Sequence, residues 1–129
     1  MKTYADYAFY INTYKGDMPD DDFDRLIIGA SYEVRRNIFN RDITGYEDEV
    51  QMATCSIVDI LFKIETLEKK RHKMISENRV KTESVGDYSR TFESDDIKDI
   101  EVQISNQKEK IKEELRRYLL DTGLLYRGV

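Results

Sequence analysis

The sequence predicts a mainly α-helical protein: a small helical bundle around a long central helix, with a β-hairpin inserted before the C-terminal helix. Two observations favour the helices. Apolar residues recur at steps of three and four through most of the chain, and between residues 50 and 64 they form two adjacent stripes. One observation favours the hairpin, because residues 79–93 are rich in strand-forming side chains around Gly86-Asp87.

Length and charge restrict the protein class. The chain has 129 residues, which suits one domain, 1–129, with a single modest core. Its net charge of −5 argues against non-specific coating of nucleic acid, which requires an excess of Lys and Arg. Cys55 is the only cysteine, so no intramolecular disulfide is expected. No signal-peptide pattern or bilayer-length apolar run is evident, so we expect a soluble protein made inside the cell.

Two helices are predicted before the central one. Thr3 and Asp6 can open a helix over residues 4–14, and Gly16 can end it in a left-handed conformation. Pro19 suits the first turn of a second helix that reaches about Asn37. The aspartates that follow Pro19 complement the positive end of the helix dipole. A turn over residues 38–45 comes next.

The central helix is predicted from Thr44 to about Lys73. Thr44 and Glu47 form a capping-box pattern at its start. A helix with two apolar stripes is covered from more than one side, so the other helices should pack around this one. The first stripe contains Val50, Ala53, Ile57, Ile60, Leu61 and Ile64, and the second contains Met52, Cys55, Val58 and Phe62.

The last third of the chain has three predicted parts. Residues 79–93 are interpreted as a β-hairpin that turns at Gly86-Asp87. Ser94 is expected to cap a final helix that ends at Thr122-Gly123. The C-terminal tail, about residues 122–129, contains Leu124, Leu125 and Tyr126, which either fold back on the domain or anchor in a partner.

No catalytic, metal or cofactor site is predicted. Cys55 and His72 lie seventeen positions apart on one predicted helix, about 25 Å along its axis, which is too far for a nucleophilic pair. A zinc site needs about four ligands at suitable spacings, which the chain does not supply. Residues 20–24 are rich in aspartate but lack the glycine and the final glutamate of a calcium loop, so helix capping explains them better.

Besides the C-terminal tail, two sets of residues are candidates for contacts with partners. The basic cluster is either a solvated helix end or a patch that meets an acidic surface, such as the acidic first third of a neighbouring copy. The hairpin is either a surface turn or an edge that pairs with another chain. The basic cluster comprises Lys69, Lys70, Arg71 and Lys73, with Arg79 and Lys81 nearby, and the hairpin candidates are Val85, Gly86, Asp87 and Tyr88.

Several motifs together resemble the small helical head–tail connector proteins of tailed bacteriophages, also called head-completion or adaptor proteins. The resemblance covers nearly the whole chain. Its most specific parts are Ser84-Val85-Gly86-Asp87-Tyr88-Ser89 and the ending Tyr118-Leu119-x-x-Thr122-Gly123-Leu124-Leu125-Tyr126-Arg127-Gly128. Less specific parts are Thr3-Tyr4-x-x-Tyr7, Pro19-x-x-x-Phe23-x-x-Leu26 with Ala30-Ser31, and the apolar helix around Ala53.

The resemblance implies a non-enzymatic virion protein at the head–tail interface, made in the bacterial cytoplasm. It would form a ring of about twelve copies beneath the portal protein. The ring would bind the portal on one side and a tail-side connector or tail terminator on the other. Packaged DNA would pass through the channel without sequence-specific binding. By this likeness, Leu124, Leu125, Tyr126 and Arg127 are the predicted portal contacts, and Val85, Gly86, Asp87 and Tyr88 the predicted subunit contacts.

Two other classes are considered. A small packaging-terminase subunit is also a helical phage ring protein, but it should show a helix-turn-helix and a basic face, which the acidic balance disfavours. A small helical enzyme is the second alternative. No set of acid, base and nucleophile residues converges in the sequence to favour it.

Overall fold

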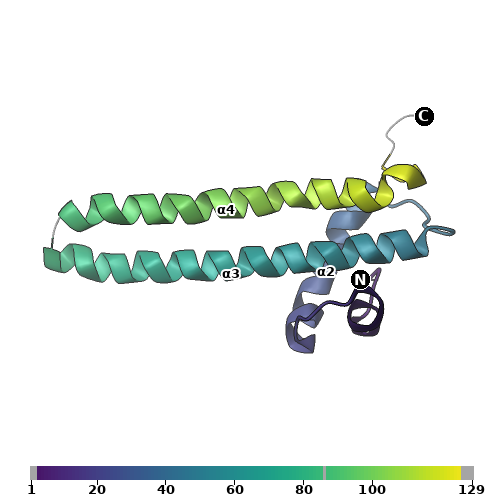
Figure 1. The fold of residues 1–129 in the computed structure, drawn as a ribbon, viewed down its shortest axis with the longest axis horizontal. Coiled ribbons are helices and arrows are strands. Elements are labelled where there is room, and N and C mark those ends of the chain that lie inside the picture. Colours follow the sequence, from purple (N-terminus) through teal and green to yellow (C-terminus); the bar gives the residue numbers. More distant parts are fainter. Residues whose placement is uncertain (1–2, 86, 126–129) are drawn as a thin grey trace. The chain divides into compact units, whose positions relative to one another are not determined.

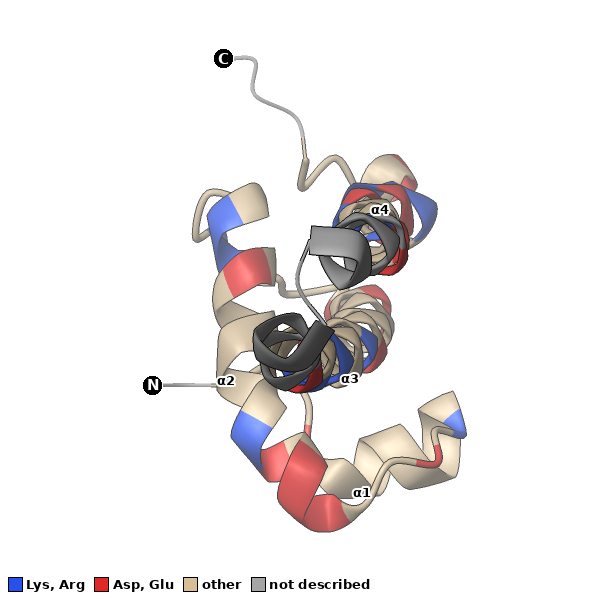
Figure 2. Ribbon diagram, turned by 90° about the vertical axis from the view of Figure 1, so that its left-hand side faces the viewer, with Lys and Arg blue, Asp and Glu red and all other residues tan. Residues whose placement is uncertain are grey.

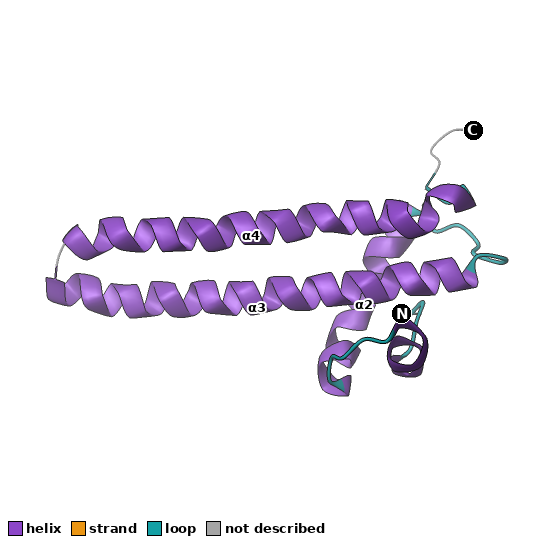
Figure 3. Ribbon diagram, in the orientation of Figure 1, coloured by secondary structure: helices purple, strands orange, loops and turns teal. Residues whose placement is uncertain are grey.

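The computed structural model describes the backbone of residues 3–85 and 87–125, and the side chains of residues 3–77 and 96–125. All the regular structure in these ranges is helical (Figure 3). The elements are α1 (Tyr7–Phe9), the π-helix η1 (Tyr10–Tyr14), α2 (Asp20–Asn37), α3 (Glu47–Val85), α4 (Asp87–Leu119) and the 3-10 helix η2 (Leu120–Thr122). The mainly helical prediction is therefore confirmed.

The predicted β-hairpin over residues 79–93 is wrong. In the described backbone, α3 runs to Val85 and α4 starts at Asp87, so helix replaces both expected strands. Ser94 is consequently inside α4 and does not begin it. Strand propensity is a weak preference that context overrides, and Tyr88, Thr91 and Phe92 also fit helical steps of three and four. The Gly86-Asp87 pattern therefore marks the place where α3 gives way to α4, and not the turn of a β-hairpin.

The chain forms two compact units. One comprises residues 1–62 and 110–129, and the other comprises residues 63–109. In the second unit the last part of α3 and the first part of α4 run antiparallel, side by side (Figure 1). Arg71 and Glu101 link them through an Nε–Oε1 contact of 3.1 Å. The buried apolar side chains described in this unit are Ile64, Leu67, Ile100 and Ile104.

The first unit holds the main hydrophobic core. Residues of η1, α2, α3 and α4 contribute to it. Both predicted stripes of α3 contribute to the core, since Val50 and Ile57 from one stripe and Cys55 and Val58 from the other are fully buried. The expectation that the start of this helix is covered from more than one side is confirmed. Other members of the core are Ala5, Tyr10, Met18, Phe23, Ile27, Ala30, Val34, Ile38, Ala53, Leu115, Leu119 and Leu124.

The start of α3 differs from the predicted capping box. The helix begins at Glu47, three residues later than Thr44. The Glu47 carboxylate accepts a hydrogen bond from the Gly45 amide at 3.0 Å. The Thr44 amide and hydroxyl donate to Asp42 Oδ1 instead, at 3.1 and 2.7 Å. These bonds hold the pKa of Asp42 below its usual range. The Asp42 carboxylate therefore accepts the hydrogen bond from the Thr44 amide that Glu47 would accept in a capping box.

The N-terminal segment is held by a stack of tyrosines. The rings of Tyr7 and Tyr14 each stack on that of Tyr10, with centroids 6.0 and 5.6 Å away. Tyr7 donates a hydrogen bond to the Met18 carbonyl at 2.8 Å, and the Met18 amide donates to the Tyr10 hydroxyl at 3.1 Å. The loop before α2 is thereby tied to the segment that precedes it.

Gly16 has a different role from the predicted one. Lys15, with φ of 68°, adopts the left-handed conformation that ends η1. Gly16 is needed for space, because a Cβ at this position would lie 2.0 Å from the Tyr10 ring. That ring is fully buried and stacked, so it cannot easily move aside.

We expect Gly16→Ala to destabilise the protein by about 1–3 kcal/mol, because an added methyl group overpacks the site against Tyr10. Denaturant unfolding followed by circular dichroism measures this change. Gly29→Ala is the matched control, since a Cβ there would meet only Leu61 at 3.9 Å. It should be stabilising by about 0.5–1 kcal/mol, because glycine is a poor helix former. Equal effects of the two substitutions would contradict the packing described for Gly16.

Candidate interaction surface

The described side chains do not form a recognisable catalytic or metal centre. Among them, no group of three or more His, Cys, Asp or Glu residues is placed to hold a metal ion. No buried side-chain nitrogen or oxygen atom in this part of the chain lacks a hydrogen-bond partner. None of the described helices is both long and apolar enough to cross a membrane.

Cys55 is a core residue of α3. Its side chain is fully buried, and burial, with smaller contributions from Asp59 and Asp6, raises the pKa of its thiol to about 12. The thiol is therefore protonated at neutral pH and cannot serve as a nucleophile. His72 is exposed in the other unit.

We expect Cys55 to resist a water-soluble thiol reagent while the protein is folded. A rise in pKa from 9.0 to about 12 lowers the thiolate population at neutral pH by about a thousandfold. Burial slows the reaction further. Labelling that is quenched at successive times and analysed by mass spectrometry measures the rate of thiol modification in the folded chain and in the denaturant-unfolded control. Comparable rates in the folded and unfolded chains would contradict the burial of Cys55.

The predicted basic cluster is divided, because Arg71 lies on another side of α3 from Lys69 and Lys73. Successive residues on a helix are separated by about 100°, so Lys69, Lys70 and Arg71 point in three directions. Lys69 pairs with Glu65 at 3.4 Å on its own helix, and Arg71 pairs with Glu101. Lys70 and Lys73 are exposed. This arrangement favours the interpretation as a solvated helix surface.

The predicted subunit-contact residues are only partly described. Val85 ends α3, and Asp87 and Tyr88 begin α4, but their side chains lie outside the described set. Gly86 lies outside the described residues altogether. With helix in place of strands, the proposed pairing of a strand edge with another chain no longer applies. A contact role for these residues stays a prediction.

The start of the C-terminal tail is part of the core. Leu124 is 6% exposed and belongs to the hydrophobic cluster, and Leu125 packs against that cluster. Arg41 fastens the segment, because its Nη1 donates to the carbonyls of Gly123 at 3.2 Å and Leu124 at 3.0 Å. Of the two alternatives for these leucines, the structure favours folding back on the domain. Tyr126 and Arg127 lie outside the described residues, and the portal-binding role of the tail stays a prediction.

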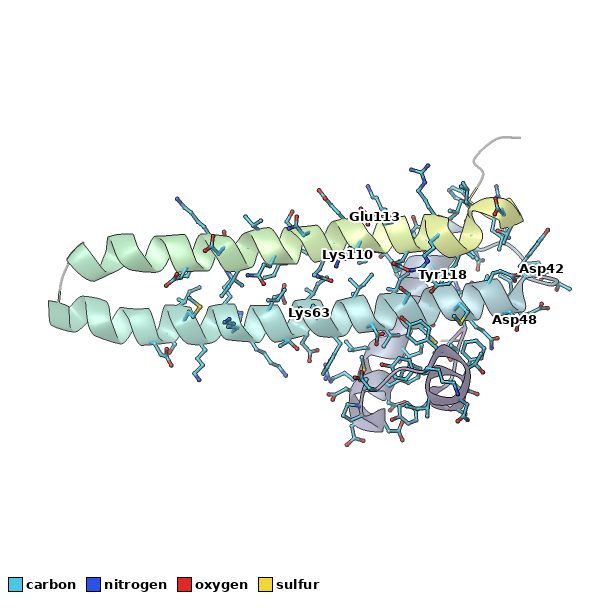
Figure 4. The ribbon with its side chains drawn as sticks, in the orientation of Figure 1. Asp42, Asp48, Lys63, Lys110, Glu113 and Tyr118 are labelled. Atoms are coloured by element: carbon cyan, nitrogen blue, oxygen red, sulfur yellow. The ribbon has the colours of Figure 1, made fainter. Side chains whose placement is uncertain are left out.

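A partly buried polar network joins three elements of the first unit. The Tyr10 hydroxyl donates to Asp59 Oδ1 at 2.6 Å, linking η1 to α3. Ser56 donates to Glu114 Oε2 at 3.0 Å, linking α3 to α4. Burial and the nearby Asp59 raise the pKa of both Tyr10 and Tyr14, so both hydroxyls remain protonated. Figure 4 shows Tyr118 on the side of α4 that faces α3. The network positions the elements and contains no activated group.

The sequence did contain a signal for this network. Asp59 is a single acidic residue in the apolar run of α3, adjacent in sequence to Val58 and Ile60. A carboxylate in such a place needs hydrogen-bond partners, because burying it without them is unfavourable. Its partner Tyr10 lies 49 residues away, so sequence reasoning could not have named it.

A hollow of about 580 Å³ lies at the C-terminal end of α2, and we call it the cationic hollow. Leu115 and Leu125 supply apolar lining, and Phe39, 45% exposed, contributes an aromatic ring. None of the lining residues that the structure describes is acidic. Its lining also contains Asn37 and the three cationic residues Arg36, Lys112 and Arg116. Sequence reasoning missed this site, because its residues come from three separate segments.

The outward face of α2 carries two large apolar side chains. Ile28 is 51% exposed and Tyr32 is 52% exposed, and they lie one helical turn apart. Together with the cationic hollow, they make the end and outer face of α2 the strongest candidate for contacts with other proteins among the described residues.

Comparison with known proteins adds no relative. No protein-family model, no curated protein and no solved structure matches this chain.

Proposed function

We propose that this chain is a non-enzymatic structural protein that forms a ring adaptor between the portal of a phage head and the tail. The proposal rests on the sequence resemblance to head–tail connector proteins. Its motifs extend from the first helix to the C-terminal segment. In this role the ring would prolong the DNA channel and offer a platform to the next tail component.

The observation that carries most weight is the contrast between the core and the outer face of α2 in the first unit. In the core, every described buried side-chain nitrogen or oxygen atom has a hydrogen-bond partner. The outer face nevertheless exposes Ile28 and Tyr32. Exposing neighbouring large apolar groups is unfavourable unless a partner covers them, as it would in an assembly.

The buried leucines refine the predicted portal contact. Leu124 holds the end of the chain to its own core, so it is available to a partner only if the fold opens. The proposed portal contact therefore depends on Tyr126 and Arg127, an aromatic anchor and a cation. Aromatic and arginine side chains are the residues most often found to dominate binding energy at interfaces.

A truncation after Leu125 tests this proposal without removing the core leucines. The full chain should co-sediment with the portal protein of the same virus, and the chain of residues 1–125 should lose that binding while its thermal unfolding is unchanged. Removal of residues 123–129 is a poorer test, because it also deletes Leu124. Failure of the full chain to bind the portal would overturn the proposal, and undiminished binding of the truncated chain would overturn the assignment of Tyr126 and Arg127.

A further inference from the structure

The two ends of α2 carry opposite charges. Asp20 and Asp21 lie in its first turn and Asp24 follows, and all three are exposed. At the other end, the cationic hollow contributes three positive charges. Figure 2 shows acidic residues at the start of α2 and basic residues toward its end. With 18 residues, the helix separates these ends by about 27 Å.

The hollow is suited to an acidic segment that also has an apolar group. Its three cations face a cavity without a lining carboxylate, so a bound carboxylate would not meet repulsion from the walls. The ion pair that Arg36 forms with Glu33 is loose, because its Nη2 lies 3.7 Å from the Glu33 Oε1 atom. Leu115, Leu125 and the ring of Phe39 provide apolar contact area. A segment with carboxylates beside an apolar side chain would satisfy both kinds of surface.

The start of α2 has this composition. Pro19 is exposed and directly precedes Asp20 and Asp21. Its fixed backbone shape lowers the entropy lost when the segment is immobilised in a complex. Asp22 is already paired with Arg25 at 2.7 Å, so we assign the contact to its neighbours.

We propose that the cationic hollow of one copy binds the start of α2, residues 19–24, of a second copy. The inference deepens the proposed function, on which it rests for the biological need for self-association, by naming the two surfaces that meet. The proposed contact is head-to-tail: each copy binds one neighbour through its hollow and another through the start of its α2. A head-to-tail contact leaves one unused surface at each end, so it propagates and yields a ring when the rotation between copies closes.

Charge reversal at each surface tests this contact. One variant carries Lys112→Glu and Arg116→Glu, and the other carries Asp20→Lys and Asp21→Lys. Sedimentation velocity of the full chain should show self-association of the wild type that weakens on raising the salt from about 0.1 M to about 1 M, where the Debye length falls from about 10 Å to about 3 Å. Each variant should associate at least about a hundredfold more weakly, because like charges then face each other.

Mixing the two variants distinguishes a head-to-tail contact from a symmetric one. The intact acidic segment of the first variant can still bind the intact hollow of the second. The reversed hollow of the first variant and the reversed segment of the second are complementary as well. An equimolar mixture should therefore form oligomers larger than dimers in which the two variants alternate, whereas a symmetric contact would stop at heterodimers. Placing all four substitutions in one chain should restore assembly, because the charges are then exchanged and again complementary.

Matched controls make the same change in net charge at exposed residues outside the two proposed surfaces. Asp48→Lys with Glu49→Lys reverses two exposed carboxylates in the first turn of α3. Lys98→Glu with Lys110→Glu reverses two exposed cations of α4 outside the hollow. Asp48 and Lys110 are labelled in Figure 4. Both controls should self-associate like the wild type, and circular dichroism should show that every variant is folded.

Two results would overturn the inference. One is a wild-type chain that stays monomeric at its highest soluble concentration, and the other is reversed variants that associate as well as the controls. Portal binding, measured in the same samples, separates this inference from the proposed function. A chain that binds the portal while its reversed variants still assemble would refute the contact and leave the adaptor proposal intact.

Discussion

Tyr10→Ala should destabilise the protein by about 3–5 kcal/mol, the usual cost of removing a fully buried aromatic side chain. The ring of Tyr10 is 0% exposed and packs on those of Tyr7, Tyr14 and Phe23. Its hydroxyl donates to Asp59 and accepts from the Met18 amide. The substitution removes all these contacts and leaves the partly buried Asp59 carboxylate with one fewer hydrogen-bond partner. Denaturant unfolding measures the free-energy change.

Tyr10→Phe separates the ring from the hydroxyl. The ring contacts are retained, so only the hydrogen bonds to Asp59 and Met18 are lost. A hydrogen bond to a charged group contributes about 1.5–3 kcal/mol, so we expect a destabilisation in that range. If the phenylalanine variant were as stable as the wild type, the Tyr10–Asp59 bond would have no structural role.

Leu124→Ala should destabilise the protein by about 2–5 kcal/mol, the range for truncating a buried leucine. This leucine is 6% exposed within the main core, and Arg41 binds the backbone carbonyl of the same residue. The result matters for function as well as stability, because the sequence left open whether this segment anchors in a partner. Thermal and denaturant unfolding of the isolated chain measure the change.

Leu120→Ala is the matched control for this substitution. Leu120 is 58% exposed and lies in η2, four residues before Leu124. Exposed substitutions usually change stability by less than about 0.5 kcal/mol, so this variant should unfold like the wild type. A negligible effect of Leu124→Ala would show that this residue is free in solution, as a portal anchor would require.

The helical core was predictable from sequence because its signal is local. Both apolar stripes of α3 follow helical steps, and burial of residues such as Ile57 and Cys55 confirms them. The position of α2 was predicted for a similar reason, since Pro19 and the aspartates after it mark a helix start. The structure begins that helix at Asp20 with Pro19 in the capping position.

The strand prediction failed where local preference is ambiguous. Residues 79–93 contain side chains that suit strands, and Gly86-Asp87 suits a hairpin turn as well as a change between helices. Strand preference in particular depends on neighbours that a sequence does not reveal. The described backbone of α3 and α4 is helical on both sides of Gly86.

The cationic hollow and the polar network could not be predicted because each joins distant residues. Arg36, Phe39 and Lys112 come together only through the packing of α2 and its following turn beside α4. Asp59 needs Tyr10, which lies on another element. Spacing rules describe one element at a time, so they locate a charged residue but do not identify its neighbours.

Negative-stain imaging of the full chain mixed with the portal protein of the same virus tests the adaptor role most directly. We expect annular particles in which this chain adds a second ring to the portal. Portal particles that carry no added ring, in samples where the chain is folded and in excess, would contradict the proposed function.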